Sequence, residues 1–180
     1  MKTTLTLITT LLFIGVCSRE NSVSNTVSIS QPAKTDTLRI IKDIKAQFSA
    51  INSGSNLYRK KERAVSGLSA EGGTVTSYYN KTVLVKEHVV LYGETGKVEM
   101  DLYFNQGGLF FEYKAETIYD KPIYIKGYKI KGVQENRYYF YKGELIRWLG
   151  PGNKIMNPFS DKFKDENKAL KESLKQIKES

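Results

Sequence analysis

The chain has 180 residues, of which 28 are Lys or Arg and 19 are Asp or Glu, so its formal net charge is +9. The length suits one domain, and 40% hydrophobic residues exclude a disordered polyelectrolyte. The single Cys and single His exclude an internal disulfide, a Cys-rich zinc site and a multi-histidine metal site. The composition therefore predicts a basic globular domain, and no cofactor is expected.

The N-terminus has the pattern of an export signal. Lys2 provides a positive charge, and residues 5–16 are apolar with only Thr and Gly interruptions. A helix of this length spans about 18 Å, which is too short for the ~30 Å hydrocarbon core of a bilayer. We therefore predict that residues 1–18 are a signal peptide and not a transmembrane helix.

Two processing routes are compatible with the end of this segment. Ile14-Gly15-Val16-Cys17 resembles the lipobox of bacterial lipoproteins, although Val16 stands where that family usually has Gly, Ala or Ser. The resemblance implies a lipid-modified Cys17 that anchors the protein to a membrane of the cell envelope. The alternative is ordinary signal-peptidase cleavage after Ser18, which would discard Cys17 and leave the protein periplasmic or secreted.

The body of the protein is predicted to start after a tether. Residues 19–34 are rich in Ser and Asn and have no apolar period, which is typical of a flexible linker. From residue 35 the pattern changes to that of one folded domain, residues 35–180. Apolar residues spaced three or four apart predict a helix over 37–51, capped by Asp36 or Thr37 and stopped by Gly54. Its apolar face consists of Leu38, Ile41, Ile44, Phe48 and Ile51.

Three similar segments, residues 78–86, 103–111 and 139–147, indicate hairpins. Each begins with two aromatic residues, continues through turn-forming residues such as Lys142-Gly143, and returns with Leu followed by further large residues. A further turn is predicted at residues 93–96. The segments resemble the strand–turn–strand repeat of bacterial MORN-type proteins, without the steady interval of that family. The resemblance implies hairpins, and it carries no function.

A second amphipathic helix is predicted at the C-terminal end. Ser160 is its expected cap, and one face carries Phe163, Leu170, Leu174 and Ile177. The order of elements predicts an α+β fold, in which an antiparallel meander of about six strands is covered on one face by the two helices.

Few residues suggest catalysis. His88 is the only neutral-pH proton shuttle, and it is better explained as a strand residue. Glu99 and Asp101 share one face of a strand and could form a carboxylate pair for hydrolysis, but exposed alternation explains them equally well. Whether the protein is an enzyme is uncertain, and the residue types favour a non-catalytic role.

Aromatic and basic residues suggest binding. Arg147-Trp148 at a strand end could form part of a ligand groove or fill the core, and the aromatic row of Tyr78, Tyr103 and Tyr139 carries the same two alternatives. The basic segment 114–131 contains three Tyr that could stack on bases, yet export removes the protein from cytoplasmic nucleic acid, so none is expected as a partner. The same surface could approach anionic lipid or polysaccharide.

These observations lead to one expectation with two alternatives. We expect an exported protein of the bacterial envelope that binds a protein or glycan partner without catalysis. The alternatives are a small envelope hydrolase that uses carboxylates, and an inhibitor or immunity-type protein. The sequence does not identify the protein or glycan partner. A membrane is a partner only under the alternative in which Cys17 carries a lipid anchor.

Overall fold

The structure is a computed structural model that describes residues 34–180. These residues belong to one compact unit, Gln31–Ser180. The predicted signal peptide, the lipidation site Cys17 and the tether up to residue 33 lie outside the described residues, and they remain predictions. Lys34, expected at the end of the tether, is the first residue of a helix.

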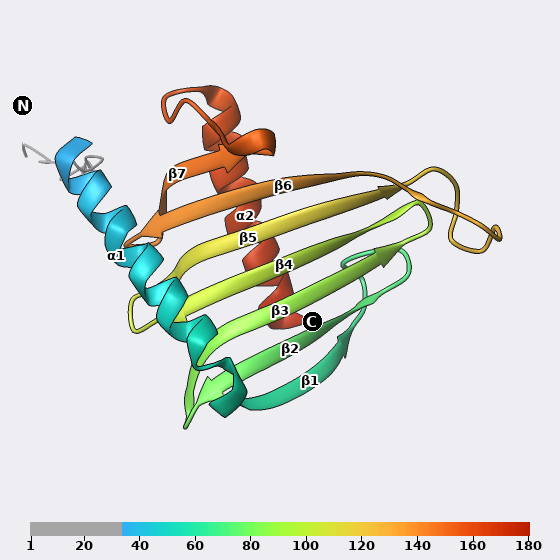
Figure 1. Ribbon diagram of the computed structural model, residues 1–180, viewed down its shortest axis with the longest axis horizontal. Helices are drawn as coiled ribbons and strands as arrows, with labels where there is room; N and C mark the ends of the chain where they lie inside the picture. The colour runs from blue at the N-terminus through green and yellow to red at the C-terminus, as the bar shows by residue number, and fades with distance from the viewer. Residues whose placement is uncertain (1–33) are drawn as a thin grey trace, which may run out of the picture. The chain divides into compact units, whose positions relative to one another are not determined.

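The centre of the fold is one antiparallel sheet whose eight strands lie side by side in chain order (Figure 1). The strands are β1 (Arg59–Val65), β2 (Gly73–Asn80), β3 (Val83–Gly93), β4 (Gly96–Asn105), β5 (Gly108–Tyr119), β6 (Ile130–Tyr141), β7 (Glu144–Gly150) and β8 (Lys154–Ile155). Two short 3-10 turns, Ser55–Leu57 and Pro151–Asn153, precede β1 and β8. The α+β class and the antiparallel meander are confirmed.

The predicted number of about six strands is wrong, because both edge strands escape the apolar pattern. Strand β1 has the sequence RKKERAV and pairs with β2 from Arg59 to Val65. Charged residues are common on edge strands, where they prevent pairing with other chains. Strand β8 has only two residues, Lys154 and Ile155. Neither edge strand can therefore be recognised in the sequence from an alternation of apolar and polar residues.

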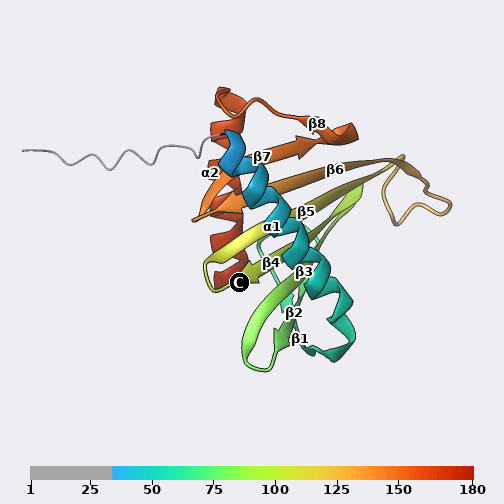
Figure 2. The same cartoon turned by 60° about the vertical axis from the view of Figure 1, so that its left-hand side comes forward.

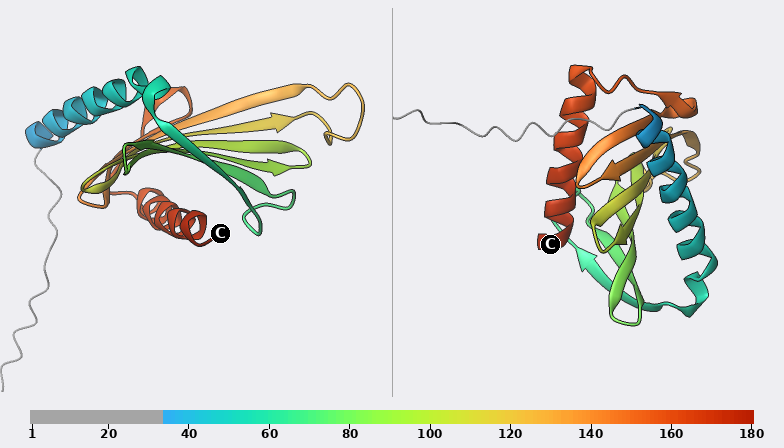
Figure 3. Two further views of the ribbon diagram at one scale, coloured as in Figure 1. Left: turned by 90° about the horizontal axis from the view of Figure 1, so that it is seen from below. Right: turned by 90° about the vertical axis from the view of Figure 1, so that its left-hand side faces the viewer.

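The two helices cover opposite faces of the sheet, not one face as predicted. Helix α1 (Lys34–Ser53) crosses the face toward the viewer in Figure 1, and α2 (Asp161–Glu179) lies behind the sheet. The turned views show the sheet between them (Figures 2 and 3). The alternation of side chains explains this arrangement, because a sheet with apolar residues on both faces must bury both.

Strand register assigns each side chain to a face, since directly paired residues point the same way. One row across the sheet faces α1 and consists of Lys60, Tyr78, Lys86, Tyr103, Phe111, Tyr139 and Arg147. The next row faces α2 and consists of Ser77, Glu87, Leu102, Glu112, Tyr138 and Trp148. Where two aromatic residues follow each other in these strands, one side chain thus faces α1 and the other faces α2.

The three similar segments form hairpins with the same irregularity. In each hairpin one residue after the turn has no partner in the register, namely Val85, Phe110 and Ile146. All three are buried, and Phe110 and Ile146 join the cluster beneath α1. Such bulges let two successive side chains lie on one face. The internal similarity of the sequence therefore corresponds to a repeated backbone geometry.

Three apolar clusters form the core. The cluster beneath α1 contains Ile41 and Ile44 with aromatic residues of β4 to β6. Two clusters lie beneath α2, one around Ile177 and Val89 and one around Phe163 and Trp148. The described residues that form these clusters lie within residues 41–177, inside the compact unit.

The helices largely match their predicted limits. Helix α1 begins three residues before Thr37, so Asp36 lies in its first turn, and Gly54 follows its end as expected. Ile41 and Ile44 are buried, but Leu38 is 55% exposed. Ser160 caps α2 as predicted, because its Oγ accepts a hydrogen bond from the backbone N–H of Phe163. Between residues 34 and 180, neither helix has the length and apolar character to cross a bilayer.

Candidate functional site

A large concavity lies beside the middle of α1. It separates the helix from the turns of the β4–β5 and β6–β7 hairpins and has a volume of about 570 Å³. We call it the α1–turn hollow. It is lined by Ile40, Asp43, Ile44, Gln47, Asn105, Gln106, Gly107, Leu109, Phe110, Phe140, Tyr141 and Lys142. This volume is within the range typical of small-ligand sites.

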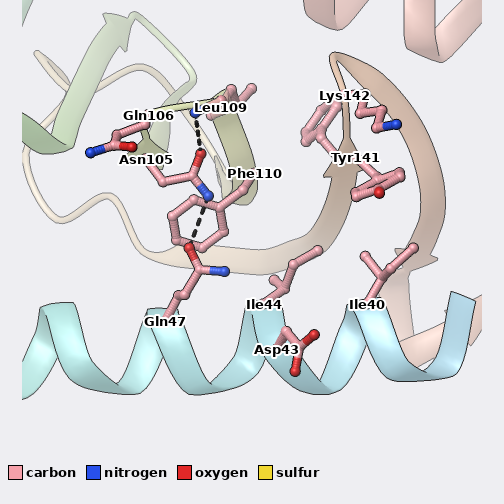
Figure 4. A pocket seen from close by; sticks show the side chains of 12 residues that line it. Ile40, Asp43, Ile44, Gln47, Asn105, Gln106, Leu109, Phe110, Tyr141 and Lys142 are labelled. Carbon is pink, nitrogen blue, oxygen red and sulfur yellow. Dashed lines mark hydrogen bonds between the residues drawn. The ribbon is translucent and has the colours of Figure 1, made fainter. Parts of the chain in front are cut away.

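Its floor is apolar. Figure 4 shows the side chains of Ile40 and Ile44 directed from α1 toward the hollow, opposite the ring of Phe110. Phe110 is the bulged residue of the β4–β5 hairpin, so the bulge is what directs its ring toward α1. Tyr141 adds a ring that is 39% exposed at the end of β6.

Amide groups form one side of the hollow. The Nδ2 of Asn105 donates a hydrogen bond of 2.8 Å to Oε1 of Gln47, and its Oδ1 accepts one of 2.8 Å from the backbone N–H of Gly107 (Figure 4). These bonds hold the turn against the helix. The Nε2 of Gln47 lies on the side of Ile44 in Figure 4 and makes no hydrogen bond within residues 34–180.

Two charges on the rim of the hollow have no ionic partner in the described part of the chain. No carboxylate of residues 34–180 forms a salt bridge with Lys142, and no cation of those residues pairs with Asp43. The ammonium of Lys142 lies 5.4 Å from the ring centre of Tyr141. The hollow thus combines a ring, an apolar floor and polar groups that are available to a ligand.

A second concavity lies on the same face of the sheet, beside the C-terminal half of α1. This groove has a volume of about 360 Å³ and is lined by Phe48, Asn52, Lys86, Asp101, Tyr103, Phe111, Tyr113 and Arg137. A smaller depression next to it shares Asn52 and Lys86 and adds Tyr58, Lys60 and Tyr78. We call the larger of the two the open-face groove.

The polar groups of the open-face groove are paired with one another. Asp101 Oδ1 lies 2.8 Å from Nδ1 of His88 and 3.0 Å from Nζ of Lys86. Burial alone would raise the pKa of Asp101, but the hydrogen bonds to His88 and Lys86 and the positive charge of Lys86 outweigh it and hold that pKa below its usual range. The Oη of Tyr103 donates to Asn52 Oδ1 at 3.1 Å. These groups stabilise each other and leave fewer free contacts for a ligand.

The structure places four of the five predicted binding residues in one row and the fifth on the other face of the sheet. Tyr78, Tyr103, Tyr139 and Arg147 share the row that faces α1, but Trp148 points to the opposite face. Tyr103, Tyr139 and Trp148 are each at most 5% exposed and belong to apolar clusters. Tyr78 and Arg147 are half-buried. Of the five, Tyr78 and Tyr103 line the depressions near the end of α1.

The proposed carboxylate pair has separate partners. Glu99 forms a salt bridge of 2.9 Å with Lys97, while Asp101 contacts His88 and Lys86. The carboxyl group whose pKa is raised to about 7 is Glu112, because burial penalises its charged form. Glu112 faces α2, away from the groove. Within residues 34–180, no three potential ligand side chains gather as a metal site requires.

Sequence reasoning missed the residues of the α1–turn hollow. From the sequence, Asp43 and Gln47 are expected on the solvent-exposed face of an amphipathic helix, and Asn105 is expected in a turn. The spacing of Ile40 and Asp43 on α1 carried no signal for a ligand. Ile40, an apolar residue beside the main apolar face and one turn before Ile44, is the one feature that could have indicated another contact surface.

Comparison with known proteins gives no relative. No family model, no curated protein and no solved structure matches this chain. The resemblances to the lipobox and to MORN-type repeats therefore stay predictions, and function has to be argued from the site itself.

Proposed function

We propose that this is an exported protein of the bacterial envelope that acts by binding, and that the α1–turn hollow is its site for a glycan. The observation that carries the proposal is the combination of an exposed ring, Tyr141, with two charged groups, Asp43 and Lys142, that form no salt bridge among residues 34–180, around a hollow of about 570 Å³. The short apolar leader supports the location, and the scarcity of catalytic residue types supports a binding role.

The chemistry of the hollow suits a sugar. The C–H faces of a sugar ring pack on an aromatic ring, and its hydroxyl groups both donate and accept hydrogen bonds. Tyr141 offers the ring, the amide of Gln47 donates, and the carboxylate of Asp43 accepts. The apolar floor of Ile44 and Phe110 excludes water beneath the ligand, which strengthens those hydrogen bonds. An envelope location supplies such ligands.

The test is a calorimetric titration of the protein with soluble N-acetylhexosamine oligosaccharides. We expect binding that is weakened at least about fivefold by Tyr141→Ala, and by a similar factor by Asp43→Asn, because each removes a contact of more than about 1 kcal/mol. Matched controls are Tyr92→Ala, an equally exposed ring on β3, and Asp165→Asn on α2. Binding that survives both hollow variants unchanged, or no binding to any oligosaccharide, would count against the proposal.

A hydrolytic role is the second candidate, and the contact between His88 and Asp101 favours it. A carboxylate at 2.8 Å from Nδ1 orients an imidazole as a general base requires. Under this alternative, Asp101→Asn would abolish hydrolysis of an envelope glycan while the oligosaccharide affinity of the α1–turn hollow stays unchanged. Equal turnover in wild type and Asp101→Asn would reject it.

A further inference from the structure

The β5–β6 loop, residues 120–129, extends past the other turns at its end of the sheet (Figures 1 and 3). This loop and the first residue of β6 expose five large apolar side chains: Ile123, Tyr124, Ile125, Tyr128 and Ile130. Tyr124 is 72% exposed and Ile130 is 63% exposed. Apolar side chains gathered in this way on a protruding surface are typical of an interaction site.

The loop is held in shape by its own hydrogen bonds. The backbone N–H of Lys129 donates to Asp120 Oδ1 at 2.7 Å, and that of Asp120 donates to the carbonyl of Lys129 at 3.0 Å. The N–H of Ile123 donates to the carbonyl of Glu94 at 2.8 Å, which ties the loop to the neighbouring turn. The apolar side chains are therefore presented by an ordered backbone, so little ordering entropy opposes binding.

Positive charges surround these apolar side chains. Lys121, Lys126, Lys129 and Lys131 lie in or beside the loop, and none of them forms a salt bridge in the described part of the chain. Asp120 is the acid within the loop, and Glu94 is the acid of the adjacent turn. The surface thus has an apolar tip within a basic rim.

We propose that this loop docks the domain onto an anionic phospholipid bilayer. Tyr rings favour the interface between headgroups and acyl chains, aliphatic side chains enter the acyl region, and Lys side chains reach back to anionic headgroups. Three of the five apolar residues are Ile, whose side chains insert into lipid but do not stack on bases. This favours lipid over a single-stranded nucleic acid, which the same charges would also attract.

The patch continues onto the strands that carry the loop. Ile118 at the end of β5 and Val133 on β6 are 39% and 50% exposed. Thr117 pairs with Val133, and Ile118 pairs with Gly132, so the two side chains point to opposite faces of this strand pair. Each face of the strand pair thus carries one exposed apolar side chain next to the loop. The proposal is independent of the glycan site, which lies at the opposite ends of β5 and β6.

The experiment measures co-sedimentation of the protein beginning at Gln31 with vesicles, so that the N-terminal apolar segment and Cys17 contribute nothing. Vesicles of equal parts phosphatidylcholine and phosphatidylglycerol are compared with phosphatidylcholine alone. We expect preferential binding to the anionic vesicles, which Lys126→Gln with Lys129→Gln weakens about 30-fold, because each lysine near an anionic surface contributes about fivefold. Tyr124→Ser with Ile125→Ser should weaken binding at least about tenfold.

The controls separate a local contact from general attraction. Lys61→Gln with Lys168→Gln removes the same charge elsewhere, and Phe159→Ser removes another exposed apolar side chain. Equal losses in loop and control variants would overturn the proposal, as would equal binding to neutral and anionic vesicles. Tight binding of oligothymidine that depends on the loop lysines, without vesicle binding, would replace lipid by nucleic acid as the partner.

Discussion

The indole Nε1 of Trp148 donates a hydrogen bond of 2.9 Å to Oδ1 of Asn136, and both side chains are buried. The ring of Trp148 also stacks with that of Tyr138 at a centre distance of 5.8 Å and contacts Phe163 of α2. The one Trp of the chain is therefore a core residue with its polar atom satisfied. Its fluorescence reports on the packing of α2 against the sheet.

This pair gives the first prediction. Asn136→Ala leaves the indole N–H buried without an acceptor, which should lower the free energy of unfolding by about 2 kcal/mol. Urea denaturation followed by Trp148 fluorescence measures the change. Asn56→Ala is the control and should be neutral, because Asn56 is exposed and its side chain has no hydrogen-bond partner among residues 34–180. Equal stability of the two variants would contradict the described contact.

The second prediction concerns pH. Burial raises the pKa of Glu112 from 4.5 to about 7, and the charge of Glu166 acts in the same direction against Lys114. The folded state therefore binds more protons at Glu112 than the unfolded state does between these values, so the contribution of Glu112 to stability is greatest below pH 4.5 and is lost as the pH rises through 7. The loss attributable to Glu112 is about 3 kcal/mol.

Comparison of Glu112→Gln with wild type measures this loss. Relative to wild type, the variant should gain about 3 kcal/mol of unfolding free energy between pH 4 and pH 8, because it cannot ionise. Glu71→Gln, on the exposed β1–β2 connection, serves as the control and should show no such gain. Parallel stability curves for Glu112→Gln and wild type would show that the carboxyl does not titrate as described.

The third prediction compares two positions on the helices. Ile177 of α2 is 1% exposed and contacts the β1–β4 side of the sheet through its cluster, so Ile177→Ala should cost about 3 kcal/mol. Leu38 of α1 is 55% exposed although the helical period includes it, so Leu38→Ala should change stability by less than about 0.5 kcal/mol. Thermal denaturation measures the stability of both variants. A large loss of stability in Leu38→Ala would mean that the Leu38 side chain is packed against other residues and not exposed as described.

The fourth prediction concerns the start of α2. Ser160→Ala removes the oxygen that accepts the 3.2 Å hydrogen bond from the backbone N–H of Phe163, and it should lower stability by about 1 kcal/mol. Ser173→Ala, within the same helix, tests whether the loss is specific to the cap. If Ser173→Ala destabilises as much as Ser160→Ala, capping is not the cause.

Local physical chemistry determined much of this protein. The period of three or four identified both helices, and the turn residues located the hairpins, since both signals depend on neighbours in the chain. The edge strands were missed, because β1 is almost entirely charged and β8 is only two residues long. The periodicity of a helix does not indicate which face of a sheet the helix will cover. The placement of α1 and α2 on opposite faces was therefore decided only by the tertiary structure.

The candidate site also depends on tertiary packing that the sequence pattern does not indicate. The row of Tyr78, Tyr103 and Tyr139 was visible in the sequence, but only the packing of α1 over the sheet decided that Tyr103 and Tyr139 are buried. The α1–turn hollow joins Asp43 and Gln47 to Asn105 and Lys142, which lie about 60 to 100 residues further along the chain. A concavity between segments so distant exists only after the chain has packed, because its walls share no local pattern.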